Sequence, residues 1–198
     1  NGSADLLAAT LDGIALTVTG VTVDVAGVAQ VTASGQLALA RVTPAGVGAT
    51  VRYSALKMGN VTVSGSGSGT NFGLSGSVTI ASLNTNSTTV ANRLDWTTAF
   101  DLDGDGSADV LDPGAALAAP VTGLAIDFPA TLQLSVAGGI TGNGSAAGLS
   151  NVFLTAGPVT LAGSAQFALS RQTVDVDTDG NGSADLLAAT LDGIALTV

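Results

Sequence analysis

The amino-acid sequence predicts an all-β, elongated fold, and three observations support this. Apolar residues alternate with small polar residues over long stretches, glycine and other small residues are abundant, and one segment of the chain occurs twice. We expect a repetitive, β-sandwich-like fibre module with acidic loops between its strands, and a β-solenoid is the alternative.

The duplicated segment is the most informative feature. Residues 1–18 (NGSADLLAATLDGIALTV) return unchanged as residues 181–198, which is 180 positions later. Identity over so many residues predicts a tandem array, of which this chain covers one period and the start of the next. A self-repeating unit favours an extended architectural protein over a lone enzyme.

The strands are predicted from period-two alternation. From Val21 to Leu39 the odd positions are apolar or glycine, whereas the even positions are mainly Thr, Asp, Gln, Ser and Ala. Side chains of a strand point alternately to opposite faces, so this stretch is one long strand or several that keep the same phase. The same rhythm recurs over 124–136 and 159–169, and more briefly over 61–63 and 72–80.

A second, internal repeat divides the period into two halves. Residues 18–35 align without gaps with residues 121–138, and an acidic loop lies upstream of each. The extra material of the longer half, residues 64–71 and 84–93, is expected to form loops. The predicted divisions are a longer half-repeat at 1–100 with a partial loop at its start, a shorter half-repeat at 101–176, and the start of the next period at 177–198.

Charge and composition exclude several classes of protein. All fifteen acidic residues are Asp, and the five basic residues are scattered, so no basic surface for nucleic acid is expected. Residues 128–170 carry no charge, but they alternate and are rich in Gly, Ser, Thr and Pro, so no membrane span is expected. The absence of Cys means that no disulfide holds the fold.

The first acidic loop has the spacing of a calcium site. Its carboxylates occupy loop positions 1, 3, 5 and 9, and a glycine at position 6 allows the bend. Alternate residues of a tight loop point inward, and Ca²⁺ prefers six to eight oxygen ligands. The carbonyl of position 7 and the carboxylate of position 12 would complete the site. The candidate ligands are Asp101, Asp103, Asp105, Ser107, Asp109 and Asp112.

The second acidic loop repeats this pattern with one difference. Position 12 is Ala188, so one ligand is missing, and Asp175 is a possible substitute. Asp-Gly-rich strings are also ordinary turn formers. However, so many like charges in a short loop repel one another unless a cation neutralises them, and Mg²⁺ is disfavoured because it prefers fewer protein ligands. The candidate ligands are Asp175, Asp177, Asp179, Asn181, Ser183 and Asp185.

The shared string D-x-D-G-[DN]-G-x-A-D-[VL]-L resembles the calcium loops of dockerins, thrombospondin type 3 repeats and FG-GAP or VCBS-type β repeats. The resemblance covers about eleven residues in each loop and implies calcium as the bound ion, without implying a whole fold. Segments such as VTASGQLALAR and LAGSAQFALSR are similar in style to giant tandem-repeat bacterial surface and biofilm proteins.

Catalysis is not expected. The chain has no His and no Cys, which removes the usual nucleophile and base pairs. Asp127 is predicted to be a surface residue and Trp96 a core residue, although a pocket that gathered Asp95, Asp127 and an Arg would favour a polysaccharide lyase.

The function predicted from the sequence is therefore structural. We expect a repeat of a secreted, calcium-stabilised extracellular filament, surface layer or biofilm-matrix protein at the bacterial cell surface. The alternative is the extender region of a giant adhesin. The expected partners are identical neighbouring repeats, joined head to tail, with possible lateral self-association. Calcium would act as a folding switch, because extracellular calcium is high enough to fill even a weak site.

Overall fold

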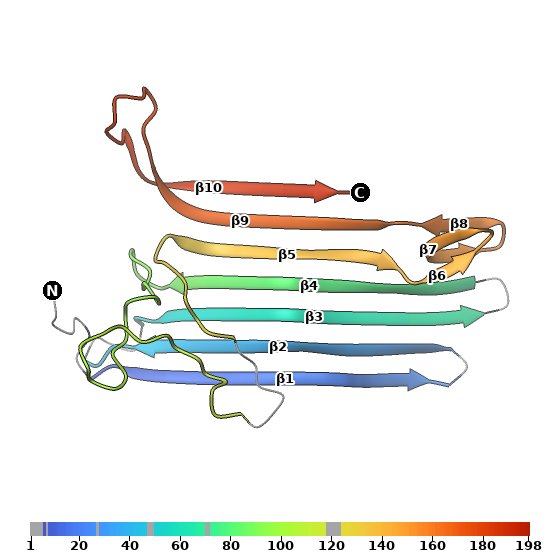
Figure 1. Ribbon diagram of the computed structural model, residues 1–198, viewed down its shortest axis with the longest axis horizontal. Coiled ribbons are helices and arrows are strands. Elements are labelled where there is room, and N and C mark those ends of the chain that lie inside the picture. Colours follow the sequence, from blue (N-terminus) through green and yellow to red (C-terminus); the bar gives the residue numbers. More distant parts are fainter. Residues whose placement is uncertain (1–5, 7, 27, 47–49, 70–71, 118–123) are drawn as a thin grey trace.

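The computed structural model describes the chain except for residues 1–5, 7, 27, 47–49, 70–71 and 118–123 (Figure 1). The described residues form no helix, and the predicted all-β class is confirmed. The strands are β1 (Thr10–Val25), β2 (Ala29–Thr43), β3 (Tyr53–Gly69), β4 (Phe72–Thr88), β5 (Leu132–Gly142), β6 (Gly144–Ala146), β7 (Leu149–Ala156), β8 (Val159–Ala162), β9 (Ser164–Val176) and β10 (Leu186–Thr197).

The ten strands belong to one open sheet, in the order β1-β2-β3-β4-β5-β9-β10. The short strands β6, β7 and β8 form a side branch at one end of the sheet (Figure 1). Every ladder between described strands is antiparallel. The described strands therefore do not have the parallel rungs of the alternative solenoid.

Two stretches expected to be loops are strand in part, and of these only residues 89–93 are irregular as predicted among the described residues. Residues 64–69 continue β3 and pair with β2 and β4, and residues 84–88 continue β4. Glycine and serine have weak strand propensity, but these residues are paired with neighbouring strands, and that tertiary context overrides propensity. The alternation between Val21 and Leu39 runs through the β1–β2 hairpin, so it belongs to two strands in phase.

The internal repeat is only partly matched by structure. Ala29 and Leu132 are aligned positions, and they begin β2 and β5. The residues before them differ, because 21–25 belong to β1 whereas 124–131 contain only an isolated bridge to Leu111. Residues 121–123 lie outside the described part of the chain. The division into two half-repeats stays a prediction.

The two faces of the sheet differ in the size of their side chains. Residues directly opposite in neighbouring strands share a face. One face, here called the small-residue face, includes Gly13, Ala40, Ala55 and Asn86 in one row across β1–β4. The other, here called the apolar face, includes a row across seven strands that is formed by Leu16, Leu37, Met58, Leu83, Val136, Leu169 and Ile194.

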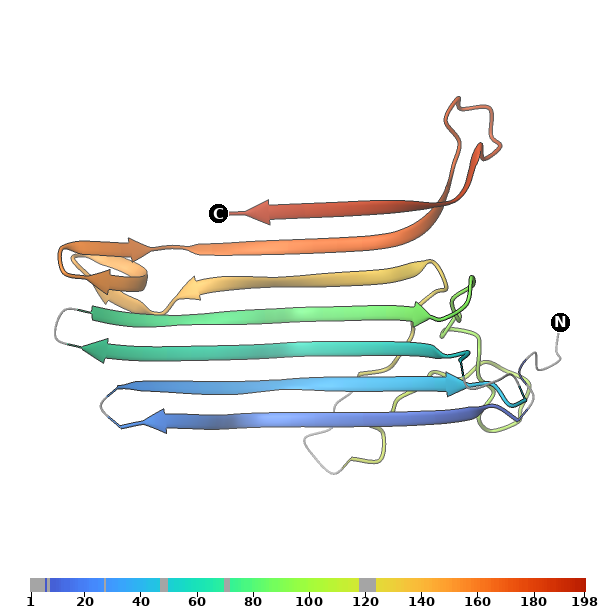
Figure 2. The same ribbon diagram turned by 180° about the vertical axis from the view of Figure 1, so that it is seen from behind.

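The core lies on the small-residue face. A covering segment, residues 94–117 and 124–131, crosses the sheet at the end where β1 begins, in front of the strands in Figure 1 and behind them in Figure 2. It buries Trp96, Ile126 and Phe128 against alanines of β2 and β3. Small side chains on the sheet leave room for this layer, and a Cβ on Gly13 would lie 3.4 Å from Pro113 Cβ.

Asn86 of β4 joins the covering segment to the sheet through three hydrogen bonds. Its amide nitrogen Nδ2 donates to the carbonyl oxygens of Leu94 (2.9 Å) and Pro129 (3.2 Å), and its Oδ1 accepts from Trp96 Nε1 (3.0 Å). Lys57 adds a second attachment through Ala125 O (2.7 Å) and the Asp127 carboxylate (2.9 Å). Trp96 is fully buried, in agreement with its predicted role in the core.

None of the described residues forms a helix with the length and apolar character that crossing a membrane requires.

Candidate metal-binding loops

The first acidic loop is closed by its own backbone and carboxylates. The amide of Asp109 donates to Phe100 O (2.7 Å), which joins the two ends of the loop. The carboxylate of Asp101 accepts from the amides of Gly104 (2.8 Å) and Gly106 (3.0 Å). Both glycines have positive φ, 81° and 86°, a conformation that costs glycine little. The chain therefore curls around the carboxylate at loop position 1.

The second loop repeats this geometry 76 residues later. Asp185 N donates to Val176 O (2.8 Å), and Asp177 accepts from the amides of Gly180 (2.8 Å) and Gly182 (2.7 Å). These glycines have φ of 77° and 88°. The two loops share these three hydrogen bonds although they lie in different surroundings. The loop fold is therefore determined by its own sequence.

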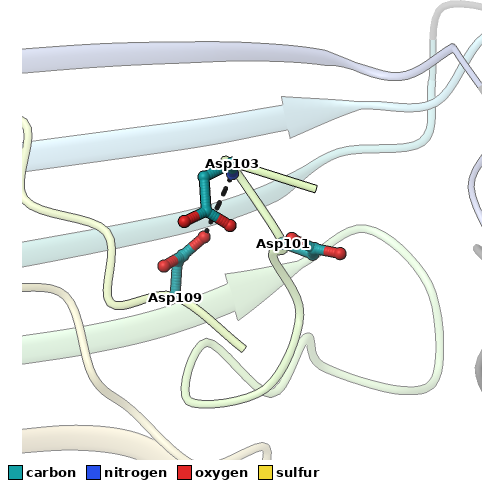
Figure 3. Close-up of side chains that lie close together, drawn as sticks. All are labelled: Asp101, Asp103 and Asp109. Carbon is teal, nitrogen blue, oxygen red and sulfur yellow. Dashed lines mark hydrogen bonds between the residues drawn. The ribbon is translucent and has the colours of Figure 1, made fainter. Parts of the chain in front are cut away.

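In each loop the structure gathers three of the predicted ligands. One carboxylate oxygen from each of Asp101, Asp103 and Asp109 lies within 4.8 Å of the other two, and the same holds for Asp177, Asp179 and Asp185. Figure 3 shows the carboxylates of Asp103 and Asp109 close together, with the bond from the Asp103 amide to Asp109 dashed (3.4 Å). Such clusters are repulsive, and a divalent cation that bridges the oxygens would relieve the repulsion.

Hydrogen bonds in the second loop favour the charged form of its carboxylates. The amide of Gly182, followed by that of Gly180, holds the pKa of Asp177 below its ordinary value. The hydroxyl and the amide of Thr178 lower the pKa of Asp185. A carboxylate that is ionised at neutral pH and still has free lone pairs is the form in which Asp binds a hard cation.

The remaining predicted ligands have other contacts. Asp105 accepts from the amide of Ser107 (2.7 Å), and the corresponding Asn181 accepts from the amide of Ser183 (2.8 Å). Asp112, the predicted position-12 ligand, accepts from Gly114 N (2.8 Å) and is not in the three-carboxylate cluster.

Asp175, the predicted substitute ligand, accepts from Ala188 N (2.8 Å). Ala188 has a φ of 54°, so this bond supports an unusual conformation at the start of β10. The carboxylate of Asp175 is not in the cluster of the second loop either.

The hydrogen bond that Thr178 adds to the second loop was not predicted from the sequence. Thr178 Oγ1 donates to Asp185 Oδ2 (2.6 Å), a bond that Leu102 cannot form at the same position of the first loop. The Thr-for-Leu exchange between the two copies is the signal that could have identified it. The two Asp residues considered for catalysis have structural contacts, since Asp95 accepts from Thr97 N (3.0 Å) and Asp127 pairs with Lys57.

The loops occupy the same end of the sheet. The second loop connects β9 to the start of β10. The first loop is part of the covering segment, and Pro113, just beyond it, lies beside Gly13 near the start of β1. The partial loop expected at residues 1–5 lies outside the described residues.

Comparisons with known proteins found no family model, no curated sequence and no solved structure that matches this chain.

Proposed function

We propose that this protein is a structural repeat of a calcium-stabilised extracellular filament, surface layer or biofilm matrix, in which one β-sheet continues from repeat to repeat. The observation that carries the proposal is that the duplicated sequence forms β1 at one edge of the sheet and β10 at the other, each paired in the same register with a similar strand.

The register of the duplicated strand supports this continuation. Asp12 of β1 lies opposite Arg41 of β2, and Asp192 of β10 lies opposite Arg171 of β9. The two ion pairs have N–O distances of 2.8 and 2.6 Å. β2 and β9 share the pattern SxQxALxR, at 34–41 and 164–171. The same strand therefore pairs with two similar partners in the same register.

The free edges of the sheet complement one another. β1 bonds to β2 on its inner side, and β10 bonds to β9 on its inner side, while both strands point in the same direction (Figure 1). The outer edge of β10 is therefore the edge through which its duplicate, β1, binds β2. In a tandem array, β10 of one period is β1 of the next. Each exposed edge is then paired, which removes the aggregation hazard of an open sheet.

The burial of a duplicated leucine gives independent support. Leu6 packs against the core under the covering segment, whereas its copy Leu186 is 51% exposed. No second covering segment lies over β10 among the residues that the structure describes. A following repeat would supply one, and Leu186 would then be buried like Leu6.

Calcium would stiffen the junction between repeats. The second loop lies within the hairpin that joins β9 to the duplicated strand β10, so its conformation determines how the next repeat begins. Without a cation the clustered carboxylates repel one another, and the hairpin loses a restraint. Extracellular calcium, in the millimolar range, would fill even a weak site.

The array is tested by its axial spacing. The hydrogen-bonded path has seven strands, and because β10 duplicates β1, six belong to each period. Strands lie about 4.8 Å apart, so each added period should lengthen the sheet by roughly 29 Å. Electron microscopy of a protein with several consecutive periods should show this spacing. As a control, residues 190–198 at each junction are replaced by a Gly-Ser linker, which should abolish the fixed spacing. Repeats that move independently in the unaltered protein would contradict the proposal and favour the adhesin extender.

Calcium binding is tested on the 198-residue chain by isothermal titration calorimetry. Two sites per chain are expected, and Asp177→Asn should remove the site of the second loop. Asp24→Asn is a matched control, because Asp24 is exposed and lies on β1 outside both loops. Absence of binding at millimolar calcium, or equal loss in both variants, would refute the assignment of the ion.

A further inference from the structure

We infer that the apolar face of the sheet is an interaction surface that binds the same face of a second copy of the chain. The two sheets would form the layers of a β-sandwich. The inference is drawn from the single repeat and does not depend on calcium or on the tandem array.

The apolar face is hydrophobic from one edge of the sheet to the other. Besides the seven-residue row that defines it, a second row is formed by Val21, Ala33, Val63, Val78, Ile140 and Ala165. Large side chains of these rows are exposed: the exposed fraction is 52% for Leu16, 39% for Leu169 and 79% for Ile194. Soluble monomers rarely expose so large a continuous apolar patch, which marks an interface.

Nothing in the described part of the chain covers the middle of this face. The covering segment lies on the small-residue face, as Lys57 and Gly59 show through their contacts with Ala125 and Leu124. At the far end the ring of Phe153 fills the space beside Gly76, and this covers only that end. The described residues therefore leave the middle of this face open to a second copy of the chain.

The size of the face is sufficient for a stable dimer. Six intervals of about 4.8 Å across the strands, and about ten residues of about 3.3 Å along them, give roughly 1,000 Å². A typical specific interface buries about 800 Å² on each partner. Two sheets pack about 10 Å apart with interdigitating side chains, which requires two broad and gently twisted apolar surfaces. A second copy provides a surface of this shape and composition.

The charges on the face favour a copy of the chain over an acidic or basic partner. At the paired strand positions of this face the charged residues are Asp12, Arg41, Arg171 and Asp192, which lie on other rows, toward the end where β1 and β10 begin. Each carboxylate is already paired with a guanidinium of its own sheet. The face therefore has no net charge to attract a polyanion or an anionic lipid surface. The acidic loops lie beyond the strand ends, so two faces can meet without bringing the loops into the interface.

Sedimentation velocity on the 198-residue chain tests the inference through a pair of neighbouring variants. Leu169→Lys places a charge on the apolar face, on β9 beside the edge strand β10, and Ser170→Lys places the same charge on the same strand but on the opposite face. The wild-type protein and Ser170→Lys should be dimeric at micromolar concentration. Leu169→Lys should weaken the dimer at least about a hundredfold, because an unpaired charge would be buried. The inference would be overturned if the wild-type protein were still a monomer at about 100 μM, roughly a hundred times the concentration at which the dimer is expected. It would also be overturned if both variants changed the dimer equally.

A milder pair of variants covers the case in which Leu169→Lys fails to fold. The chain has no Cys, so Leu169→Cys and Ser170→Cys each carry a single thiol. Maleimide should label Ser170→Cys rapidly, and Leu169→Cys at least about tenfold more slowly while the protein is dimeric. Equal labelling rates would overturn the inference. Co-sedimentation of a monomeric wild-type protein with phosphatidylcholine vesicles would also overturn it, because the occupant would then be a lipid surface.

Discussion

The attachment of the covering segment through Asn86 leads to a prediction about stability. Asn86 is 1% exposed, and its amide makes three hydrogen bonds to the covering segment. Asn86→Ala removes all three. Pro129 O keeps a partner, the amide of Leu132 (3.1 Å). Trp96 Nε1 and Leu94 O would lose the bonds that Asn86 provides.

The expected loss follows from these two groups. A buried polar group left without a partner costs about 1–3 kcal/mol, so Asn86→Ala should lower the free energy of unfolding by about 4 kcal/mol. A domain of this size is stable by about 5–15 kcal/mol. Asn86→Asp should behave similarly, since a carboxylate keeps the acceptor for Trp96 but loses both donors. Ser87→Ala, on the neighbouring exposed position, should cost less than about 1 kcal/mol.

Urea unfolding followed by tryptophan fluorescence measures this loss directly. Trp96 is the only tryptophan, and it is fully buried beside Asn86, so its emission reports whether the covering segment is in place. Its emission should move to longer wavelength at a lower urea concentration in Asn86→Ala. A loss below about 1 kcal/mol with unchanged Trp96 emission would refute the assigned role of Asn86.

Two further predictions concern the sheet. The ion pair with Arg171 lowers the pKa of Asp192. The pair therefore stabilises the folded protein above the unfolded pKa of about 3.9, and this contribution is lost as the pH falls through the lower folded value. Urea unfolding between about pH 7 and about pH 2.5 should show a smaller loss of stability in acid for Asp192→Asn than for the wild-type protein. Gly138→Ala should destabilise the sheet by about 1–3 kcal/mol, because the new Cβ would lie 2.9 Å from Phe167 Cζ and would clash with Thr79 O. Unfolding equal to wild type, with Ala137→Ser as the matched control, would contradict the close packing at Gly138.

Alternation predicted extended backbone well, but it did not predict which extended segments would pair. Leu124, Ile126 and Phe128 are buried and the residues between them are more exposed, as the alternation indicates. Yet these residues belong to the covering segment, with only one isolated bridge. An extended chain packed on one side has the same period as a strand. Pairing depends on which neighbours are free to form a ladder, and a single sequence does not contain that information.

The acidic loops were the most predictable part of the candidate site, because their conformation depends on local contacts. Gly104 and Gly106 permit the turn, and the Asp101 carboxylate collects their amides within six residues. Position 12 was less predictable. Its place depends on how the chain leaves the loop, and at Asp112 the chain enters a turn that uses the carboxylate for Gly114.

The register offset between β1 and its duplicate β10 connects the proposed array with the proposed interface. The row that contains Asp192 passes through Arg171 and Leu134 and reaches β1 at Ile14, two residues beyond Asp12. Because this offset is even, the duplicated strand presents the same side chains on the same face at both edges. An odd offset would turn the leucines of the next period to the opposite side. Six antiparallel strands per period likewise preserve the strand direction. The apolar face would therefore continue unbroken along an array, and each added repeat would extend the surface on which a second sheet can pack.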